Sequence, residues 1–192
     1  TDFRNEMSFS EESLERTADA YRRIRNTIRF LMGNLNDFDF QKDKISGDQY
    51  SELDKWIVLK TKDLQTEVIK DFENYDIHFA FQKILNFCTN ELGGFYLDII
   101  KDRLYTSKRD GSARRSAQSA MHQIYTSLLT LVAPILSFTT EEIFKLLFED
   151  KKSIHLEKFL SFPLKFKNEK LNEKWSELIK IRNICNLSIE EK

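Results

Sequence analysis

The segment YRRIRNTIRFLMGNLNDF, residues 21–38, carries the helical pattern that decides the fold of this chain. At about 100° per residue, its apolar side chains share one face of a helix. They are Tyr21, Ile24, Ile28, Leu31, Met32 and Leu35. Arg22, Arg25, Asn26 and Arg29 lie on the other face, and with Arg23 the segment holds four arginines with no acid between them. Because clustered guanidiniums repel one another, the pattern predicts a core-facing helix whose outer face suits a polyanion such as a nucleic acid.

Glycine and proline are scarce in the whole chain, with five glycines and two prolines in 192 residues, which favours long helices over short strands. The apolar spacing predicts helices over 10–32, 49–74, 77–105, 113–138, 139–148 and 169–190. The predicted fold is all-α: an antiparallel helical bundle over residues 1–150, then a connector and an additional C-terminal helix over 151–192.

Local signals refine these helices. Gly93 and Gly94 predict a kink or a close helix crossing within the third helix, because they remove side-chain bulk. Pro134 predicts a bend in the fourth helix, and TTEE at 139–142 predicts a capping box that starts the fifth. Most aromatic residues fall at core spacing: Trp56, Phe79, Phe81, Phe87, Phe95, Tyr96, Tyr125 and Phe138. Phe30 instead projects beside the arginine face, where it could stack on an unpaired base.

Several classes of protein are excluded by what the chain lacks. Cys88 and Cys185 are far apart, which predicts reduced thiols and neither a disulfide framework nor a metal site. The three histidines are scattered, and no spacing typical of a catalytic or metal-ligating group appears. No apolar run approaches the roughly 18 residues that span a membrane, and TDFRNEMSFS has no signal-peptide core. We therefore expect a cytoplasmic protein that does not enter membranes.

Charge is nearly balanced overall, at a formal net charge of −1, but it is unevenly distributed. Two basic islands stand out, at 22–29 and 101–115. In the second, Lys101 and Arg103 could pair with acids of their own helix or contact RNA. Arg114 and Arg115 lie in the first turn of a predicted helix, where the helix dipole disfavours cations. Their position therefore indicates a nearby negative charge, either an external anion or an acid from another helix. The candidate RNA-binding residues are Arg22, Arg23, Arg25, Asn26, Arg29, Lys101, Arg103, Arg114 and Arg115.

For the first island, the alternative is a solvated face in which the arginines pair with acids such as Glu15 or Asp19. Asn26 could read a base edge or cap a neighbouring backbone group. The chain as a whole could then be a helical scaffold for protein interactions with no RNA role.

Motifs along the whole chain resemble the anticodon-binding helical domain of class I aminoacyl-tRNA synthetases, most closely that of the isoleucyl enzymes. The matching segments, in order, are YRRIRNTIRFLMGNLNDF at 21–38, LDKWIV at 53–58, NFCTNELGGFYLDIIKDRLY at 86–105, RRSAQSA at 114–120, LVAPILSFTTEEIF at 131–144 and SIHLEKF at 153–159. Two positions depart from the family pattern: Gly93–Gly94 stands where Ser or Ala is usual, and Phe144 stands where Trp is usual.

The resemblance implies that the chain binds the anticodon stem-loop of isoleucine tRNA within a longer, monomeric synthetase. It implies that the full enzyme joins isoleucine to its tRNA with ATP and magnesium, and that many members carry zinc in a C-terminal tail. The chain lacks the His-Ile-Gly-His and Lys-Met-Ser-Lys-Ser signatures that bind ATP in the family. We therefore expect this part to hold no catalytic residue, metal or cofactor, to be inactive alone, and to work with catalytic and editing domains outside it.

Overall fold

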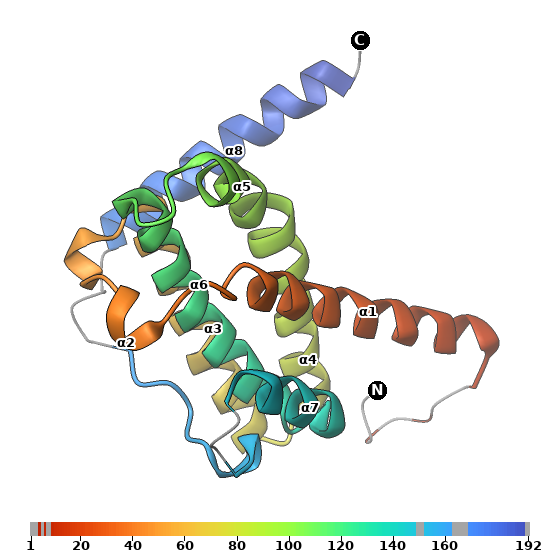
Figure 1. The fold of residues 1–192 in the computed structure, drawn as a ribbon. Helices are drawn as coiled ribbons and strands as arrows, with labels where there is room; N and C mark the ends of the chain where they lie inside the picture. Colours follow the sequence, from red (N-terminus) through yellow and green to blue (C-terminus); the bar gives the residue numbers. More distant parts are fainter. Residues whose placement is uncertain (1–3, 5, 7–8, 149–151, 163–168, 191–192) are drawn as a thin grey trace. The chain divides into compact units, whose positions relative to one another are not determined.

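The computed structural model describes residues 4, 6, 9–148, 152–162 and 169–190. The chain forms two compact units, Thr1–Ser161 and Phe162–Lys192. The first unit contains α1 to α7 (Figure 1), and the second contains α8. A domain boundary near residue 150 stays a prediction.

All secondary structure in the described residues is helical, which confirms the predicted all-α class. The helices of the first unit are α1 (Glu11–Gly33), α2 (Phe40–Asp43), α3 (Glu52–Glu73), α4 (Ile77–Asn86), α5 (Leu97–Thr106), α6 (Ser112–Val132) and α7 (Ser137–Leu147). Short 3-10 turns cover Gly47–Gln49 and Ile154–Leu156, and a π-helical segment covers Phe87–Tyr96. The helix of the second unit is α8 (Glu169–Glu190), with the predicted bounds.

The ends of α1 follow from its sequence. The Ser10 side chain accepts a hydrogen bond from the Ser13 amide, and Glu11 and Glu12 lie at the positive end of the helix dipole. At the other end, the Asn34 amide donates to the Phe30 carbonyl. The predicted apolar face is confirmed at Ile24, Ile28, Leu31 and Leu35, which are buried, while Tyr21 and Met32 are half-buried.

The helices of the first unit enclose one core. The α3 helix packs against α4 and α6, and α1 packs against α6 and the π-helical segment. Trp56, Tyr96 and Tyr125 are fully buried there, and the Trp56 and Phe95 rings meet edge to face at 5.4 Å. The N-terminal half of α1 projects beyond this core (Figure 1), and residues 11–17 are all exposed.

Residues 77–106 form one continuous helical stretch, as predicted, and of the two roles predicted for the glycines the close helix crossing is not found. They lie in the π-helical segment, and both are exposed, so no close helix crossing occurs at them. A Cβ on Gly93 would lie 3.1 Å from the Cys88 carbonyl oxygen, and one on Gly94 would lie 3.3 Å from that of Thr89. The widened helical turn therefore favours residues without a side chain.

The predicted junction of the fourth and fifth helices is wrong. The α6 helix ends at Val132, so Pro134 lies in a turn and does not bend a helix that continues to Phe138. The α7 helix begins at Ser137 and has no side-chain cap, and the Thr140 hydroxyl donates to the Leu136 carbonyl within the helix. The break is complete because Pro134 has no amide hydrogen to extend α6.

Some predicted core positions are also wrong. Phe138 is 93% exposed and Phe79 is 48% exposed, because the helices that carry them present these positions to solvent. In α8, the Leu178, Ile181 and Ile184 side chains of the predicted inward stripe are exposed.

Candidate nucleic-acid interface

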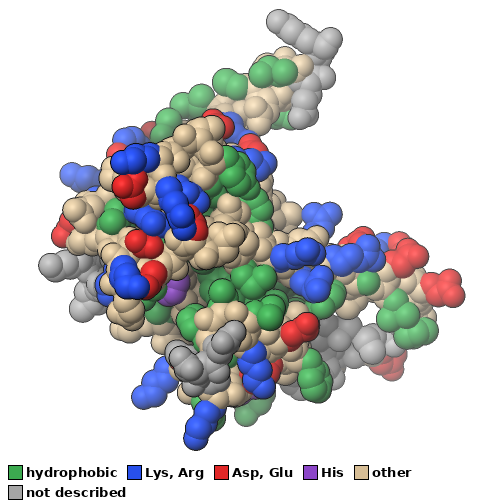
Figure 2. All heavy atoms as spheres, viewed as in Figure 1, with side chains coloured by type: hydrophobic (Ala, Val, Ile, Leu, Met, Phe, Trp, Pro, Cys, Tyr) green, Lys and Arg blue, Asp and Glu red, His purple; other side chains and the backbone are tan. Residues whose placement is uncertain are grey.

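The first basic island is a solvent-facing surface of α1. Arg22, Arg23, Arg25, Asn26 and Arg29 are all exposed. Arg22 forms an ion pair with Asp19 at 3.1 Å. For this one arginine, the alternative that the island pairs with acids of the same helix is confirmed. The side chains of Asn26 and the other three arginines form no hydrogen bond or ion pair with any residue that the structure describes. Figure 2 shows basic side chains gathered along α1, all of which are arginines.

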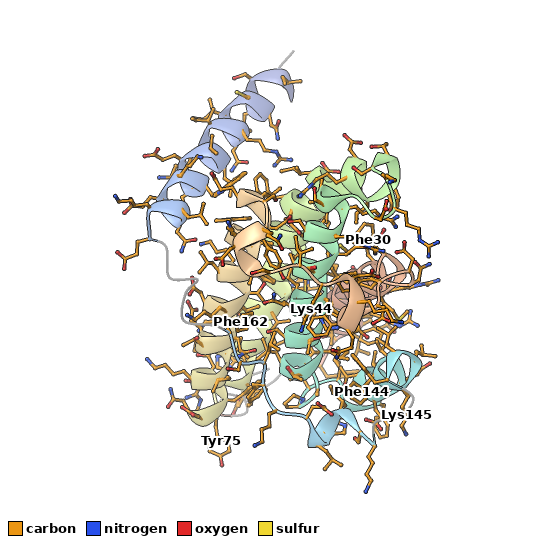
Figure 3. The ribbon with its side chains drawn as sticks, turned by 60° about the vertical axis from the view of Figure 1, so that its left-hand side comes forward. Phe30, Lys44, Tyr75, Phe144, Lys145 and Phe162 are labelled. Carbon is orange, nitrogen blue, oxygen red and sulfur yellow. The ribbon has the colours of Figure 1, made fainter. Side chains whose placement is uncertain are left out.

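The unpaired side chains occupy two flanks of α1. At about 100° per residue, Arg25 and Arg29 lie on the flank that continues from Tyr21 and Met32. Arg23 lies on the opposite flank, on the same side as Phe30. Phe30, labelled in Figure 3, is half-buried, so part of its ring remains open to solvent. The helix therefore presents guanidiniums on both flanks of its exposed face.

The second island is engaged with acids. The Lys101 ammonium lies 2.9 Å from Asp98 on the same helix, the pairing expected as the alternative. Arg103 donates two hydrogen bonds of 2.9 Å to the two carboxylate oxygens of Asp54, which is fully buried. Arg103 therefore neutralises a core carboxylate, and its guanidinium is not displayed as a free cation.

The Asp54 carboxylate also accepts hydrogen bonds from three neutral hydroxyl groups. The Tyr96 hydroxyl donates to it at 2.8 Å, and the Ser51 and Ser116 hydroxyls donate to its other oxygen. Through these bonds one carboxylate joins α3, the π-helical segment, α5 and α6. Burial raises the pKa of the Tyr96 hydroxyl well above its ordinary value, and the Asp54 charge raises it further, so Tyr96 remains a donor.

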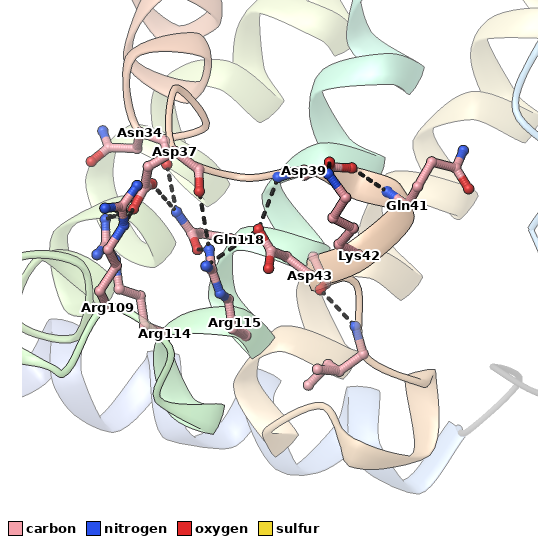
Figure 4. Close-up of polar contacts among 12 residues, drawn as sticks. Asn34, Asp37, Asp39, Gln41, Lys42, Asp43, Arg109, Arg114, Arg115 and Gln118 are labelled. Carbon is pink, nitrogen blue, oxygen red and sulfur yellow. Dashed lines mark hydrogen bonds and ion pairs between the residues drawn. The ribbon is translucent and has the colours of Figure 1, made fainter.

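Arg114 and Arg115 are engaged with the loop that follows α1 (Figure 4). An Arg114 amino group lies 3.1 Å from an Asp37 oxygen, and the Gln118 amide donates to the other oxygen at 2.8 Å. Arg115 donates to the Asp37 carbonyl and to Gln118, and it pairs with Asp43 at 3.2 Å. Of the two alternatives for this pair, an intramolecular acid is the one found, supplied by a loop and by α2.

Electrostatics hold this loop cluster together. Burial raises the pKa of Asp37, but the Gln118 hydrogen bond and the charges of Arg114, Arg115 and Arg109 outweigh it and lower the pKa. Asp37 thus stays ionised. The cluster anchors the end of α1 to the start of α6, which fixes the direction of the arginine face.

Two features of this region were missed from the sequence. Arg109, whose side chain is 74% exposed, lies 3.3 Å from Asp37. The Phe40 ring stacks on His122 at 4.1 Å, and burial together with the Lys44 charge lowers the pKa of His122 to about 4. The alternation DFDF at 37–40 is the only local signal for this contact, because His122 is far away in the sequence.

The described residues lack two features that would point to other functions. They contain no group of three or more His, Cys, Asp or Glu side chains placed to hold a metal ion. None of their helices combines the length and apolar character needed to cross a membrane.

Comparison with known proteins identifies the class to which these features belong. Residues 54–190 match the anticodon-binding domain of tRNA ligases, and the chain belongs to this family.

Its relatives are isoleucine–tRNA ligases. The ligase of Syntrophotalea carbinolica is 44% identical over 98% of this chain and 20% of its own length. The ligase of Pelagibacter ubique is 44% identical over 100% of this chain and 21% of its own length, and that of Idiomarina loihiensis is 45% identical over 99% and 20%. The chain therefore spans about a fifth of the length of these relatives.

Proposed function

We propose that this chain binds the anticodon stem-loop of isoleucine tRNA as part of a longer isoleucine–tRNA ligase. The observation that carries the proposal is the exposed set of Arg23, Arg25 and Arg29 on α1, which pair with none of the residues that the structure describes. Guanidiniums without an internal acid are free to form charge-assisted hydrogen bonds with phosphates. Phosphate contacts would position the RNA, while Asn26 and the open part of the Phe30 ring are available to its bases.

The other predicted contacts take lesser parts in this proposal. Arg22 and Lys101 form exposed ion pairs with neighbours on their own helices. Such pairs contribute about 0–1 kcal/mol, so a phosphate can displace the acid. Arg103, Arg114 and Arg115 are proposed to support binding by holding the helices that present the α1 surface, although Arg114 and Arg115 remain candidates for direct contact.

The parent enzyme would attach isoleucine to the tRNA with ATP and magnesium, as a cytoplasmic monomer. This chain would position the tRNA and perform no chemistry. ATP–pyrophosphate exchange by the chain alone would contradict that division of roles.

The test is a comparison of charge reversals along one helix. Isoleucine tRNA is titrated with the chain and with Arg25→Glu and Arg29→Glu, from about 50 to 200 mM salt. Each reversal is expected to weaken binding roughly tenfold or more, and each lost phosphate contact lowers the slope of log K against log salt by about 0.7–0.9. Arg16→Glu is the control, because Arg16 lies on the same helix but among the acids Glu11, Glu12 and Glu15, outside the basic island at 22–29.

Failure to bind at low salt, or an equal loss in Arg16→Glu, would overturn the proposal. That result would favour the second candidate, a helical protein-interaction scaffold. The observation that favours this candidate is the pairing of the second basic island with acids.

A further inference from the structure

An exposed arginine lies at the outer edge of the Asp37 cluster. Arg109 belongs to the turn between α5 and α6, and 74% of its side chain is open to solvent. The side chains of Arg114 and Arg115 are only 18% and 12% exposed, so they lie beneath it. Arg109 is therefore the guanidinium of this cluster that a ligand in solution reaches first.

The contact with Asp37 leaves the outer edge of the Arg109 guanidinium unused (Figure 4). The Arg109 Nε atom lies 3.3 Å from an Asp37 oxygen. The two terminal amino groups of Arg109 form no hydrogen bond or ion pair with any residue that the structure describes. Because the group is planar and is held at Nε, these amino groups present parallel N–H donors, which match two oxygens of one phosphate.

The charge of the cluster is not balanced. Three guanidiniums face two carboxylates there: Arg109, Arg114 and Arg115 against Asp37 and Asp43. Neighbouring charges form pairs of their own and cancel; they are Lys108 with Asp110 and Lys42 with Asp39. Lys44, which lies over the Phe40 ring, adds to the positive surplus. The surplus attracts an anion from solution, and the exposed Arg109 is where that anion can bind.

This surplus lies next to the proposed RNA surface. Asp37 follows the end of α1 by four residues, so its contact with Arg109 places the α5–α6 turn beside the end of the helix that carries the exposed arginines. Between them, Gly33 and Asn36 are exposed and carry no charge. Figure 2 shows basic side chains over α1 and over the α5–α6 connection on one face of the first unit. A phosphate backbone that follows α1 towards its C-terminal end would therefore meet Arg109 after Arg29.

We propose that the Arg109 guanidinium binds a backbone phosphate of the same RNA, beyond the end of α1. This inference rests on the proposed function and extends its contact surface from one helix to the α5–α6 turn. The pair with Asp37 is kept in the complex, because the phosphate takes the amino groups while Asp37 keeps Nε. Asp37 also keeps its bonds to Arg114 and Gln118, so the anchor of α1 stays intact when RNA is bound.

The test is a titration of isoleucine tRNA with variants at Arg109, in the same assay as the charge reversals on α1. Arg109→Gln is expected to weaken binding roughly fivefold or more and to lower the slope of log K against log salt by about 0.7–0.9. Arg109→Lys keeps the charge but not the paired donors, so it is expected to keep the slope and to lose part of the affinity. Lys70→Gln is the matched control: Lys70 is exposed and lies roughly 28 Å along α3 from Ser51, which bonds to Ser116 near the start of α6.

Phosphorothioate substitution in the anticodon arm separates a direct contact from an effect on folding. A single sulfur at the contacted phosphate is expected to weaken binding by the unaltered chain and to have no effect on binding by Arg109→Gln. If no position of the RNA behaves in this way, Arg109 does not contact the backbone and the inference is overturned.

The same titration distinguishes this inference from the proposed function. Unchanged affinity and slope in Arg109→Gln would overturn the Arg109 contact, and so would an equal loss in Lys70→Gln. If Arg25→Glu and Arg29→Glu still weaken binding in that case, the proposed function stands without Arg109. Absence of tRNA binding by the unaltered chain would instead overturn both.

Discussion

Arg25 and Arg103 carry the same charged group in opposite environments. Arg25 is exposed and unpaired among the described residues, while Arg103 donates two hydrogen bonds to the buried carboxylate of Asp54. Guanidinium suits both situations because it is always charged and its planar donors match a carboxylate or a phosphate. A basic island in the sequence therefore contains binding residues and structural residues that composition cannot distinguish.

Replacing Arg103 tests its structural role. Arg103→Met is expected to reduce the free energy of unfolding by about 3–5 kcal/mol, because it leaves the Asp54 charge buried without its partner. The measurement is urea unfolding at neutral pH. Lys101→Met is the control and should cost far less, since Lys101 pairs at the surface with an exposed acid of its own helix. A loss as small as the control would show that Asp54 does not depend on Arg103.

His122 gives the unfolding free energy a defined dependence on pH. Its pKa is lowered from 6.5 to about 4 by burial and by Lys44, so the unfolded chain takes up this proton at higher pH than the folded chain. The contribution to stability is therefore complete above about pH 6.5 and is lost as the pH falls towards 4. His122→Phe, which keeps a ring against Phe40, is expected to flatten the stability profile in this range. If the unfolding free energy depends on pH in the same way in both proteins, the lowered pKa of His122 is contradicted.

At the scale of elements, local chemistry decides where several helices end. The C-terminus of α3 is an example: the Tyr75 amide donates to the Phe72 carbonyl, and the Asp76 amide donates to the Asp71 carbonyl at 2.8 Å. These bonds form a Schellman motif, which places Tyr75 in the left-handed region at φ 60°. Figure 3 shows Tyr75 at the tip of the connection between α3 and α4. Glycine is the residue that usually takes this position, because it has no Cβ.

Tyr75→Gly is therefore expected to stabilise the protein, by roughly 1 kcal/mol, through relief of the left-handed strain. Tyr75 is 72% exposed, so little packing is lost. Tyr105→Gly is the matched control: Tyr105 is 65% exposed but lies within α5, where glycine is expected to destabilise by about 0.5 kcal/mol. Thermal unfolding measures the stability of both variants. A decrease in stability for Tyr75→Gly would show that the Tyr75 backbone is not strained.

Some helix bounds could be predicted from the sequence and others could not, for physical reasons. The bounds of α1 and α8 follow from apolar periodicity, and Ser10 and Asn34 mark the ends of α1 locally. The break between α6 and α7 was misjudged because Pro134 can bend or end a helix, and contacts made by the following turn decide between these outcomes. Gly93 and Gly94 mark the position of the π-helical segment in the sequence. A glycine pair is equally typical of a helix crossing, so the sequence does not distinguish the two structures.

At the scale of the whole molecule, charge is segregated along one helix. The N-terminal half of α1 carries the acids Glu11, Glu12, Glu15 and Asp19, and the arginines of the C-terminal half form the proposed RNA surface. A net charge of −1 conceals this arrangement, because oppositely charged regions cancel in the sum. A partner meets the local electrostatic fields, which decay over about 8 Å in physiological salt.

The sequence by itself determined the all-α class, the core and arginine faces of α1, and the resemblance to anticodon-binding domains. These properties depend on periodicity and motif order, which are local along the chain. Only the tertiary structure decided that Arg103 pairs with Asp54 and that Arg114 and Arg115 hold the loop after α1. It also decided that Arg23, Arg25 and Arg29 meet no acid among the described residues. The partner of a charged side chain is set by which distant segments folding brings within a few ångströms, and helical spacing carries no information about that distance.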